Sequence, residues 1–364
     1  MQQEIDNRHK LKNAFLQLFP DAEPGSNGNI KSFTNLEKEY HSITKGVGVR
    51  VSTGKLILKL TGNDVQEFIH RISTNDVKNL GVFKQTNTLF TNEKGRLLDR
   101  TTFLKIGDYF LLIGNYEPDK RLLSWIEKYI IMEDITVEDV TDQFTLFEFY
   151  GSQTNSFMTM MCGDNCLDLD GEKITIGETE SIKTYFSKLK EVNNIDRYVA
   201  IVANEEAINF AKFINDRKSA FDLNFIGDKV FEYFRIVNGI PGFPSEINAQ
   251  FNPHEVNLID EVSFTKGCYI GQEVIARLDT YDKVQRTLYG VKISDDVKLE
   301  LPVDVINENK EVCGTLTSLS KIKFNEDAVG LVLIRKKYLD KNSQMYIASD
   351  DKMIDLELTE LPIK

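Results

Sequence analysis

The alternation of apolar and polar residues predicts several β-strands in the first third of the chain. Residues 49–62 (VRVSTGKLILKLTG) place β-branched residues between polar ones, which favours two strands. Residues 86–115 repeat this pattern in three runs, interrupted at Glu93-Lys94-Gly95 and at Gly107-Asp108. Because glycine beside a polar residue is common in tight turns, we predict an antiparallel meander of three strands here.

Segments with helical spacing alternate with these strands. Apolar residues recur at helical intervals in residues 63–72 and 119–130, and the first 15 residues favour a short amphipathic helix before a loop at 20–32. A second set of elements is expected further along: strands near 145–150 and 197–203, and helices near 152–161, 180–191 and 205–217. Strands and helices are mixed without a regular βαβ period, so the predicted fold class is α+β.

The pattern changes again after Arg286. Short strand-like runs such as TLYGVKI and AVGLVLI alternate with turns, and no long helix interrupts them, which is typical of a small β-barrel or sandwich. We therefore predict three regions: an N-terminal helix and loop in residues 1–34, two α+β subdomains in 35–283 that divide near residue 145, and a C-terminal β-barrel in 284–364.

Composition and net charge limit the classes of molecule that this chain is expected to bind. The 364 residues include 23 Phe and 13 Tyr, enough to build a sizeable core, and the net charge is −12. An acidic chain repels nucleic-acid phosphates and anionic lipid surfaces, so we expect neither nucleic acid nor membrane as a partner. The start of the chain lacks the apolar run of a secretory signal, and four cysteines are too few for a disulfide framework, which favours a reducing cytoplasm.

One motif carries specific information. Residues 264–277 read FTKGCYIGQEVIAR and resemble the K-G-C-Y-x-G-Q-E signature of YgfZ-type folate-binding proteins of the GcvT superfamily. All its specified positions are met, by Lys266, Gly267, Cys268, Tyr269, Gly271, Gln272 and Glu273.

Other segments extend this resemblance over most of the chain. RIVNGIPGFPSE, FNPHEVNL and TNEKGRLLDR each resemble a segment of the same superfamily. The resemblance implies a T-protein-like ring of two ferredoxin-like α+β domains around a folate channel, closed by the C-terminal barrel. It also implies tetrahydrofolate or a derivative as cofactor, and iron–sulfur client or assembly proteins as possible partners of the YgfZ-type branch.

Cys268 is the main candidate for chemistry. A cysteine reacts as its thiolate, which a nearby Lys266 and the first amides of a following helix would favour. The resemblance points to a functional thiol, in cluster contact, redox sensing or folate-adduct chemistry, although a free cysteine is more often a small buried apolar residue.

Four further residues are candidates for folate binding: Arg235, Arg277, Asp196 and, discussed below, Arg100. Arg235 lies in the R-x-x-x-G-x-P region of the resemblance. Arg277 can bind a folate carboxylate or pair with Glu273 one helical turn away. Asp196 matches the T-protein acid that is expected to accept hydrogen bonds from the pterin ring of folate. The alternative interpretation of Asp196 is a solvated carboxylate at the start of a strand.

The strongest departure from T-proteins lies at residues 99 and 100. T-proteins carry Asp-Asp here, the second Asp being catalytic, whereas this chain has Asp99-Arg100. An arginine accepts no proton, and Asp99 would face the opposite side of the strand. Arg100 is left to hold a folate carboxylate or to form a surface ion pair.

The spacing of Cys162 and Cys166 falls within the range of zinc sites, but no second ligand pair lies near, so we predict no metal. The main functional hypothesis is a folate-binding accessory protein for the assembly or repair of iron–sulfur enzymes. The alternatives are a folate-dependent one-carbon transferase (an aminomethyltransferase or a demethylase) and a non-catalytic partner-binding module.

Overall fold

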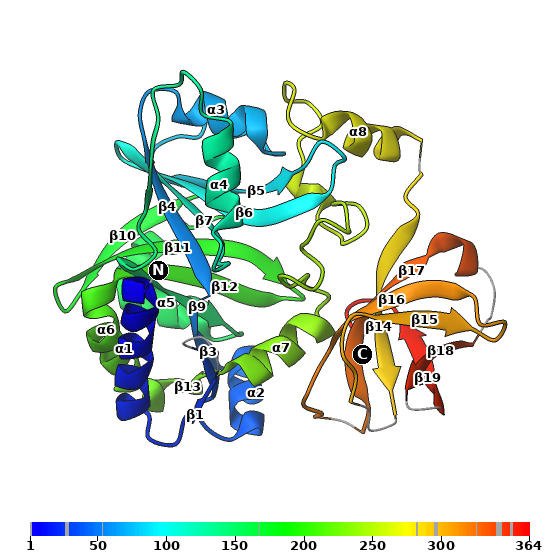
Figure 1. Cartoon of the computed structure of the whole chain (residues 1–364). Helices are drawn as coiled ribbons and strands as arrows, with labels where there is room; N and C mark the ends of the chain where they lie inside the picture. Colours follow the sequence, from blue (N-terminus) through cyan, green and yellow to red (C-terminus); the bar gives the residue numbers. More distant parts are fainter. Residues whose placement is uncertain are drawn as a thin grey trace. The chain divides into compact units, whose positions relative to one another are not determined.

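A computed structural model describes residues 2–25, 29–52, 54–166, 168–281, 283–294, 298–324, 326–339, 344–349 and 352–364 (Figure 1). The chain forms two compact units, each assembled from separate segments. Unit 1 consists of Met1–Phe68, Val77–Asn87 and Thr101–Phe231, and unit 2 of Ile69–Asp76, Thr88–Arg100 and Glu232–Lys364.

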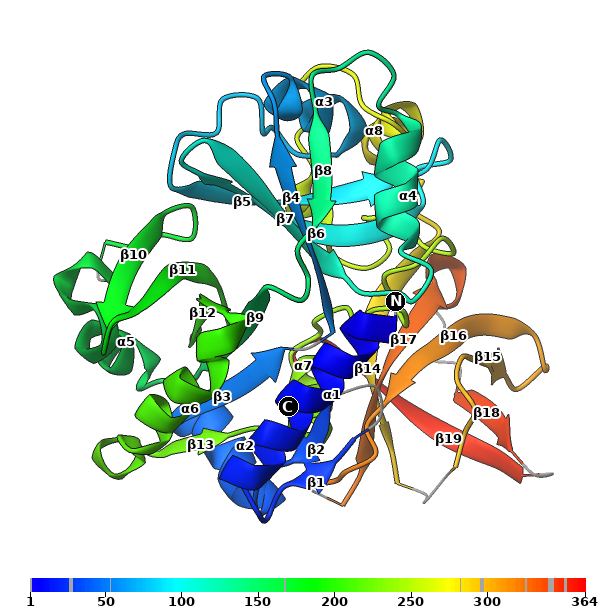
Figure 2. The same cartoon turned by 60° about the vertical axis from the view of Figure 1, so that its left-hand side comes forward.

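A six-stranded sheet forms the centre of unit 1 (Figure 2). Its order is β10-β11-β12-β9-β3-β13, and only β13 runs parallel to its neighbour. The strands are β3 (Val47–Ser52), β9 (Phe144–Tyr150), β10 (Ile174–Thr179), β11 (Ile182–Val192), β12 (Ile195–Ala203) and β13 (Leu223–Phe225).

Helices cover one face of this sheet. Phe15 of α1 (Gln2–Leu18), Phe157 of α5 (Thr154–Cys162) and Phe210 of α6 (Ala207–Asn215) join one core cluster with Phe147 and Phe149 of β9. Helix α2 (Leu36–Lys45) begins after Asn35, whose side chain accepts hydrogen bonds from two backbone amides of its first turn.

The other face of the six-stranded sheet packs against a five-stranded sheet of order β5-β6-β7-β4-β8. Leu146, Val199 and Ile201 of the six-stranded sheet belong to the same core cluster as Ile57 and Leu111 of the five-stranded sheet, all within unit 1. The strands are β4 (Lys55–Thr61), β5 (Lys84–Thr91), β6 (Leu97–Ile106), β7 (Tyr109–Asn115) and β8 (Thr136–Asp139), and the helices next to them in sequence are α3 (Val65–Ile72) and α4 (Arg121–Lys128). The predicted three-strand meander is confirmed as β5, β6 and β7.

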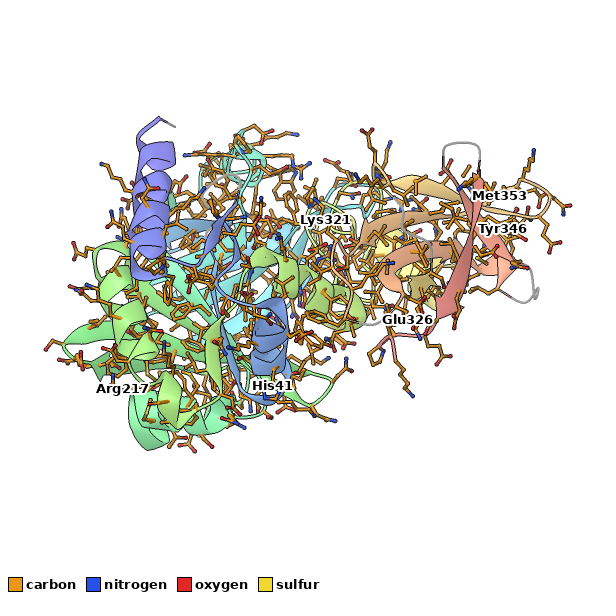
Figure 3. All side chains as sticks on the ribbon, turned by 90° about the horizontal axis from the view of Figure 1, so that it is seen from below. His41, Arg217, Lys321, Glu326, Tyr346 and Met353 are labelled. Atoms are coloured by element: carbon orange, nitrogen blue, oxygen red, sulfur yellow. A yellow bond between two sulfur atoms is a disulfide. The ribbon has the colours of Figure 1, made fainter. Side chains whose placement is uncertain are left out.

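Unit 2 contains a closed barrel of order β14-β17-β16-β15-β18-β19. Its strands are β14 (Arg286–Ile293), β15 (Val303–Asn307), β16 (Val312–Leu319), β17 (Ala328–Arg335), β18 (Met345–Ser349) and β19 (Lys352–Thr359). In β18 and β19, Ile347 and Ile354 are buried, whereas Tyr346 and Met353 lie on the outside of the barrel (Figure 3). This alternation is the period-two pattern expected of a barrel strand.

The remaining elements are short or connect the larger ones: β1 (Glu23–Pro24), β2 (Ile30–Ser32), α7 (Asp228–Val237), α8 (Gln272–Thr280) and the 3-10 turns η1 (Gly163–Cys166), η2 (Asn204–Glu206), η3 (Lys218–Ala220), η4 (Ile259–Glu261) and η5 (Lys336–Tyr338).

The α+β class and the C-terminal barrel are confirmed, but one element is wrong. The helix predicted near 180–191 is strand β11, which pairs with β10 on one side and β12 on the other. Ile182, Thr184 and Phe186 of this strand are buried at alternate positions, so a period of two outweighs the helix-favouring lysines. The predicted boundaries near residues 34, 145 and 283 stay predictions.

Candidate functional site

The motif loop, residues 264–271, packs against the turn that joins β5 to β6. The Thr91 hydroxyl donates to the Ile270 carbonyl at 2.6 Å. Gly271 has φ +86°, and a Cβ there would lie 2.6 Å from the carbonyl oxygen of Asn92. Gly95 on the facing turn has φ +65° and room for no side chain beside Ile275. Two glycines in contact therefore bring the motif and the turn together.

Lys266 anchors the motif loop through its buried side chain. The ammonium is buried and donates to the carbonyls of His70 at 2.5 Å, in the last turn of α3, and of Ser73 at 2.8 Å and Asn75 at 2.7 Å, just beyond it. Burial lowers the pKa of Lys266 to about 8, and the charge of Asp76 opposes this shift. All three N–H groups are engaged by carbonyls, so Lys266 acts as an anchor, a role that differs from the thiolate activation we expected.

Gly267 and Cys268 form the accessible apex of the loop. Both residues are exposed, and a Cβ on Gly267 would meet no atom within 4 Å. The Cys268 thiol is therefore accessible to solvent, and it is not the small buried apolar residue that was the alternative interpretation.

Tyr269 turns inward directly after this apex. Its side chain is 7% exposed, and its ring centroid lies 5.3 Å from the Lys266 ammonium. Within the described part of the chain, its buried hydroxyl has no hydrogen-bond partner. Burial raises the pKa of Tyr269 to about 12, so the hydroxyl stays protonated at neutral pH. A buried donor without a partner is costly, which makes this hydroxyl a candidate contact for a ligand.

Helix α8 begins within the motif, at Gln272. The Gln272 amide donates to the Tyr269 carbonyl at 3.2 Å, and Glu273 and Arg277 are exposed. No ion pair joins Glu273 to Arg277, and no other described side chain bonds the Arg277 guanidinium. Arg277 is thus available to an anionic ligand.

Arg100 forms a two-pronged ion pair with Glu261. Its Nε lies 3.0 Å from both carboxylate oxygens of Glu261, and its Nη2 lies 2.5 Å from one of them. Asp99 is 2% exposed, and the alternation along β6 places it on the opposite face from Arg100. Of the two alternatives for Arg100, the ion pair is present.

Arg235 is fully engaged by protein groups. Its guanidinium donates to Glu232, Glu246, Ser318 and the Ile240 carbonyl, which uses every N–H direction. Glu246 is completely buried and also accepts from Thr317 and Ser318 of β16. This network leaves no N–H of Arg235 for a ligand.

Asp196 is also held by neighbours. Its carboxylate accepts from the Asn155 amide at 2.7 Å and lies 2.9 Å from the Lys188 ammonium. The Tyr198 hydroxyl donates to the same Asn155 at 2.6 Å. A ligand at Asp196 would have to replace one of these contacts.

A buried charged cluster on β3 and β9 was missed at the level of sequence. Glu148, 8% exposed, accepts from Arg50 at 3.1 Å and from the Tyr150 hydroxyl at 2.8 Å. Burial raises the pKa of Glu148, but the charge of Arg50, together with smaller contributions from Lys55, Tyr150 and Arg197, outweighs it, and the net effect lowers that pKa. Arg50 also lies 3.4 Å from Asp228. The available signal was an acid between two phenylalanines in an otherwise apolar strand.

Cys162 and Cys166, considered above as a metal clip, are joined in a disulfide. Among the described residues, no three His, Cys, Asp or Glu side chains are grouped to hold a metal ion. In the same part of the chain, no helix is both long and apolar enough to cross a membrane.

Comparison with protein families gives one match, to the GCVT N-terminal domain over residues 15–266. A candidate chloroplastic transferase of Arabidopsis thaliana is 25% identical, covering 89% of this chain and 73% of its own. An aminomethyltransferase of Thermosipho melanesiensis is 24% identical, covering 91% and 89%. The tRNA-modifying protein YgfZ of Blochmanniella pennsylvanica is 24% identical over 66% and 70%.

Among solved structures, glycine cleavage system aminomethyltransferase T from Bartonella henselae has a similar fold. The TM-score is 0.79 at 14% identity, and the match covers 96% of each chain.

Proposed function

Since this chain belongs to the GCVT N-terminal domain family, we propose that it binds tetrahydrofolate or a derivative and assists the assembly or repair of iron–sulfur enzymes. The observation that carries the second part is the pairing of Arg100 with Glu261. Where T-proteins place their catalytic carboxylate, this chain holds a guanidinium that only donates. Aminomethyl transfer therefore lacks its proton acceptor, while the K-G-C-Y-x-G-Q-E loop of the YgfZ-type branch is complete.

The open polar groups of the chain fit parts of a reduced folate. The free guanidinium of Arg277 matches a carboxylate of the glutamate tail through its planar fork. The unpartnered Tyr269 hydroxyl can donate to a polar ring atom. Asp196 remains the proposed reader of the pterin amino edge, since one carboxylate can accept two parallel N–H bonds. When bound, tetrahydrofolate supplies nitrogens that carry one-carbon units.

Arg100 and Arg235 leave the proposed binding set, since Glu261 and Glu246 respectively hold them. Cys268 is the proposed reactive group, because its thiol is exposed on an anchored loop beside the open backbone of Gly267. The cytoplasmic location stays a proposal, and the Cys162–Cys166 disulfide weighs against the reducing compartment that the low number of cysteines favoured.

The folate part is tested by calorimetric titration of tetrahydrofolate into the full chain. Micromolar binding corresponds to about 8 kcal/mol. We expect Arg277→Ala to weaken binding by at least about tenfold, and Arg335→Ala, which removes another exposed arginine, to leave it unchanged. Absence of binding by the unaltered chain would remove folate from the proposal.

The accessory part is tested in cells that lack the native protein. We expect the Cys268→Ala variant to bind folate normally but to fail to restore the activity of an iron–sulfur enzyme. Full restoration by this variant would remove the thiol from the function and leave folate binding intact.

A folate-dependent one-carbon transferase is the second candidate function. It is favoured by the relative named as an aminomethyltransferase and by the carboxylate of Glu261, which lies beside Arg100. Methylenetetrahydrofolate formed from an aminomethyl donor, and lost in Glu261→Gln, would establish this function in place of the first.

A further inference from the structure

Sulfur side chains are concentrated at the end of α5. Residues 158–166 (MTMMCGDNC) contain three of the seven methionines and two of the four cysteines of the chain. The surrounding core is built mainly from Phe, Val, Ala and Ile, which pack well without sulfur. Packing accounts for Met158, Met161 and Cys166, which lie in this core, but not for the exposed Met160 or the partly exposed Cys162.

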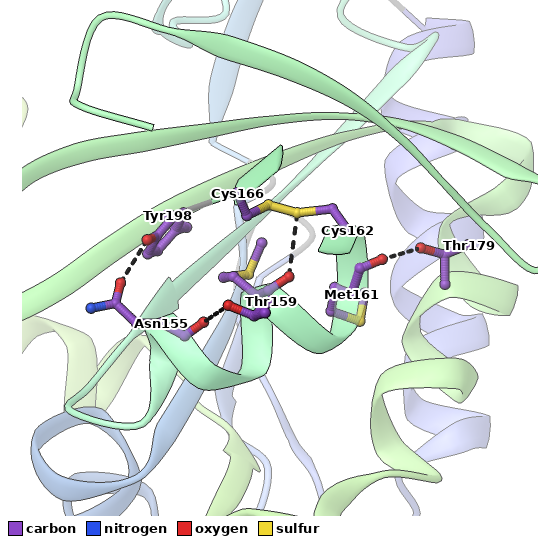
Figure 4. The surroundings of a disulfide bond; sticks show 8 residues. Asn155, Thr159, Met161, Cys162, Cys166, Thr179 and Tyr198 are labelled. Atoms are coloured by element: carbon purple, nitrogen blue, oxygen red, sulfur yellow. Dashed lines mark hydrogen bonds between the residues drawn. A yellow bond between two sulfur atoms is a disulfide. The ribbon is translucent and has the colours of Figure 1, made fainter. Parts of the chain in front are cut away.

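The fold brings two of these sulfurs into contact and a third residue beside them. Cys162 ends α5 and Cys166 ends η1, with their Cα atoms 6.0 Å apart and their side chains joined (Figure 4). Met158 lies one helical turn before Cys162, on the same face of α5, and its carbonyl oxygen is 3.3 Å from the Cys162 sulfur.

Burial divides this sulfur cluster (Met158, Cys162 and Cys166) into a protected and an accessible side. Met158 is fully buried and Cys166 is 1% exposed, whereas Cys162 is only partly buried against the same core. An ion or a reductant would thus reach the cluster at Cys162, and apolar side chains would shield its other ligands from water.

Reduction turns the disulfide into a pair of ligands. A thiol or phosphine reductant supplies two electrons, two protons are taken up, and the S–S bond gives two thiols held by the same backbone. A closed zinc site needs four ligands, and no further Cys or His in the described chain joins this pair. Thiolates and thioethers select monovalent copper, which accepts a smaller set of soft ligands.

We propose that, after reduction of the disulfide, Cys162 and Cys166 bind one monovalent copper ion as thiolates, with the Met158 thioether as the third ligand. Binding releases the two thiol protons and changes no oxidation state. The proposal is independent of folate binding and of Cys268.

The test uses the full chain carrying Cys268→Ser and Cys313→Ser, so that Cys162 and Cys166 are the remaining cysteines. Monovalent copper is titrated without oxygen against a chromogenic chelator such as bicinchoninate, using the reduced and the disulfide form of the same preparation. We expect one copper per chain in the reduced form, none in the oxidised form, and a shell of sulfur neighbours by X-ray absorption. Equal binding by both forms, or a nitrogen and oxygen shell, would overturn the proposal.

Two substitutions test the ligands themselves. Met158→Leu keeps the apolar volume and removes the thioether, so we expect the copper affinity to fall by at least about tenfold. The matched change Met345→Leu, in the barrel core, should leave it unaltered. An unchanged affinity in Met158→Leu would remove the third ligand, and displacement of the copper by equimolar zinc would refute the choice of metal. Met158→Leu and Met345→Leu both retain Cys162 and Cys166 and are compared in the same Cys268→Ser, Cys313→Ser background. Their difference therefore does not depend on the cost of replacing the buried Cys313.

Discussion

Two glycines of the motif loop should respond in opposite ways to the same substitution. Gly271 has φ +86°, and an added Cβ would lie 2.6 Å from the Asn92 carbonyl oxygen and 2.8 Å from the Thr91 hydroxyl. Gly267 has no such constraint, because an added Cβ would meet nothing within 4 Å. Gly271→Ala should therefore destabilise unit 2, and Gly267→Ala should not.

The expected magnitude follows from two costs. A non-glycine residue in the left-handed region costs about 1–2 kcal/mol. Forcing an extra carbon against packed backbone costs about 1–3 kcal/mol more, because the Asn92 carbonyl belongs to a tight turn that cannot withdraw freely. We expect Gly271→Ala to lower the free energy of unfolding by about 2–5 kcal/mol, and Gly267→Ala to change it by less than about 0.5 kcal/mol.

Urea denaturation of both variants, followed by far- and near-ultraviolet circular dichroism, measures the difference. The comparison of midpoints is more robust than a fitted free energy, since two units need not unfold in one step. Equal stability of Gly271→Ala and the unaltered chain would refute the reasoning about the contact between the loop and the turn. If Gly267→Ala keeps its stability but loses function in cells, the open backbone at residue 267 is a contact surface for a partner or ligand.

Three further results are expected. Lys266→Met should cost about 3 kcal/mol or more in a denaturation experiment, because it leaves three carbonyls without their donor. Arg235→Ala should lower stability by about 3–5 kcal/mol because it leaves the buried Glu246 unpaired, whereas Arg277→Ala should change folate affinity and leave the melting temperature unaltered. Because the pKa of Glu148 is lowered, its charge pair with Arg50 adds stability above the unfolded carboxyl pKa and loses it as the pH falls through the folded pKa. The difference in the free energy of unfolding between the unaltered chain and Glu148→Gln should therefore shrink as the pH falls. Denaturation experiments from about pH 6 to about pH 3 measure this difference. A gap that widens in acid would contradict this sign.

Local patterns were enough to predict elements whose stability is local. The meander of β5, β6 and β7 has turns marked by glycine, and α4 presents a clear apolar stripe in Leu122 and Ile126. Strand β11 was not predictable in this way, because lysines and glutamate within it favour a helix as readily. The period of two covers only its first residues, Ile182 to Phe186, and backbone pairing with β10 and β12 decides the conformation of the rest.

The candidate site shows the same division. The K-G-C-Y-x-G-Q-E string identified the loop and its exposed thiol, but it could not show what each residue contacts. The acceptors of Lys266 lie 191 to 196 residues earlier in the chain, and Glu261 lies 161 residues from Arg100. Pairings over such distances depend on tertiary structure, so the sequence left two alternatives open for Arg100 and gave Lys266 a role beside Cys268 in place of its actual acceptors.

Neither compact unit is a continuous stretch of polypeptide, since the chain passes between them after Phe68, Asp76, Asn87, Arg100 and Phe231. No single truncation can therefore isolate one of them: a fragment ending at residue 231 would carry two orphaned pieces of unit 2, including the turn that receives the motif loop. During synthesis those two segments stay without their folding partners until more than a hundred later residues have emerged from the ribosome. In that state they are exposed to chaperones and proteases. The chain therefore folds as a whole, and substitutions in its second half are expected to change how much of its first half reaches the folded state.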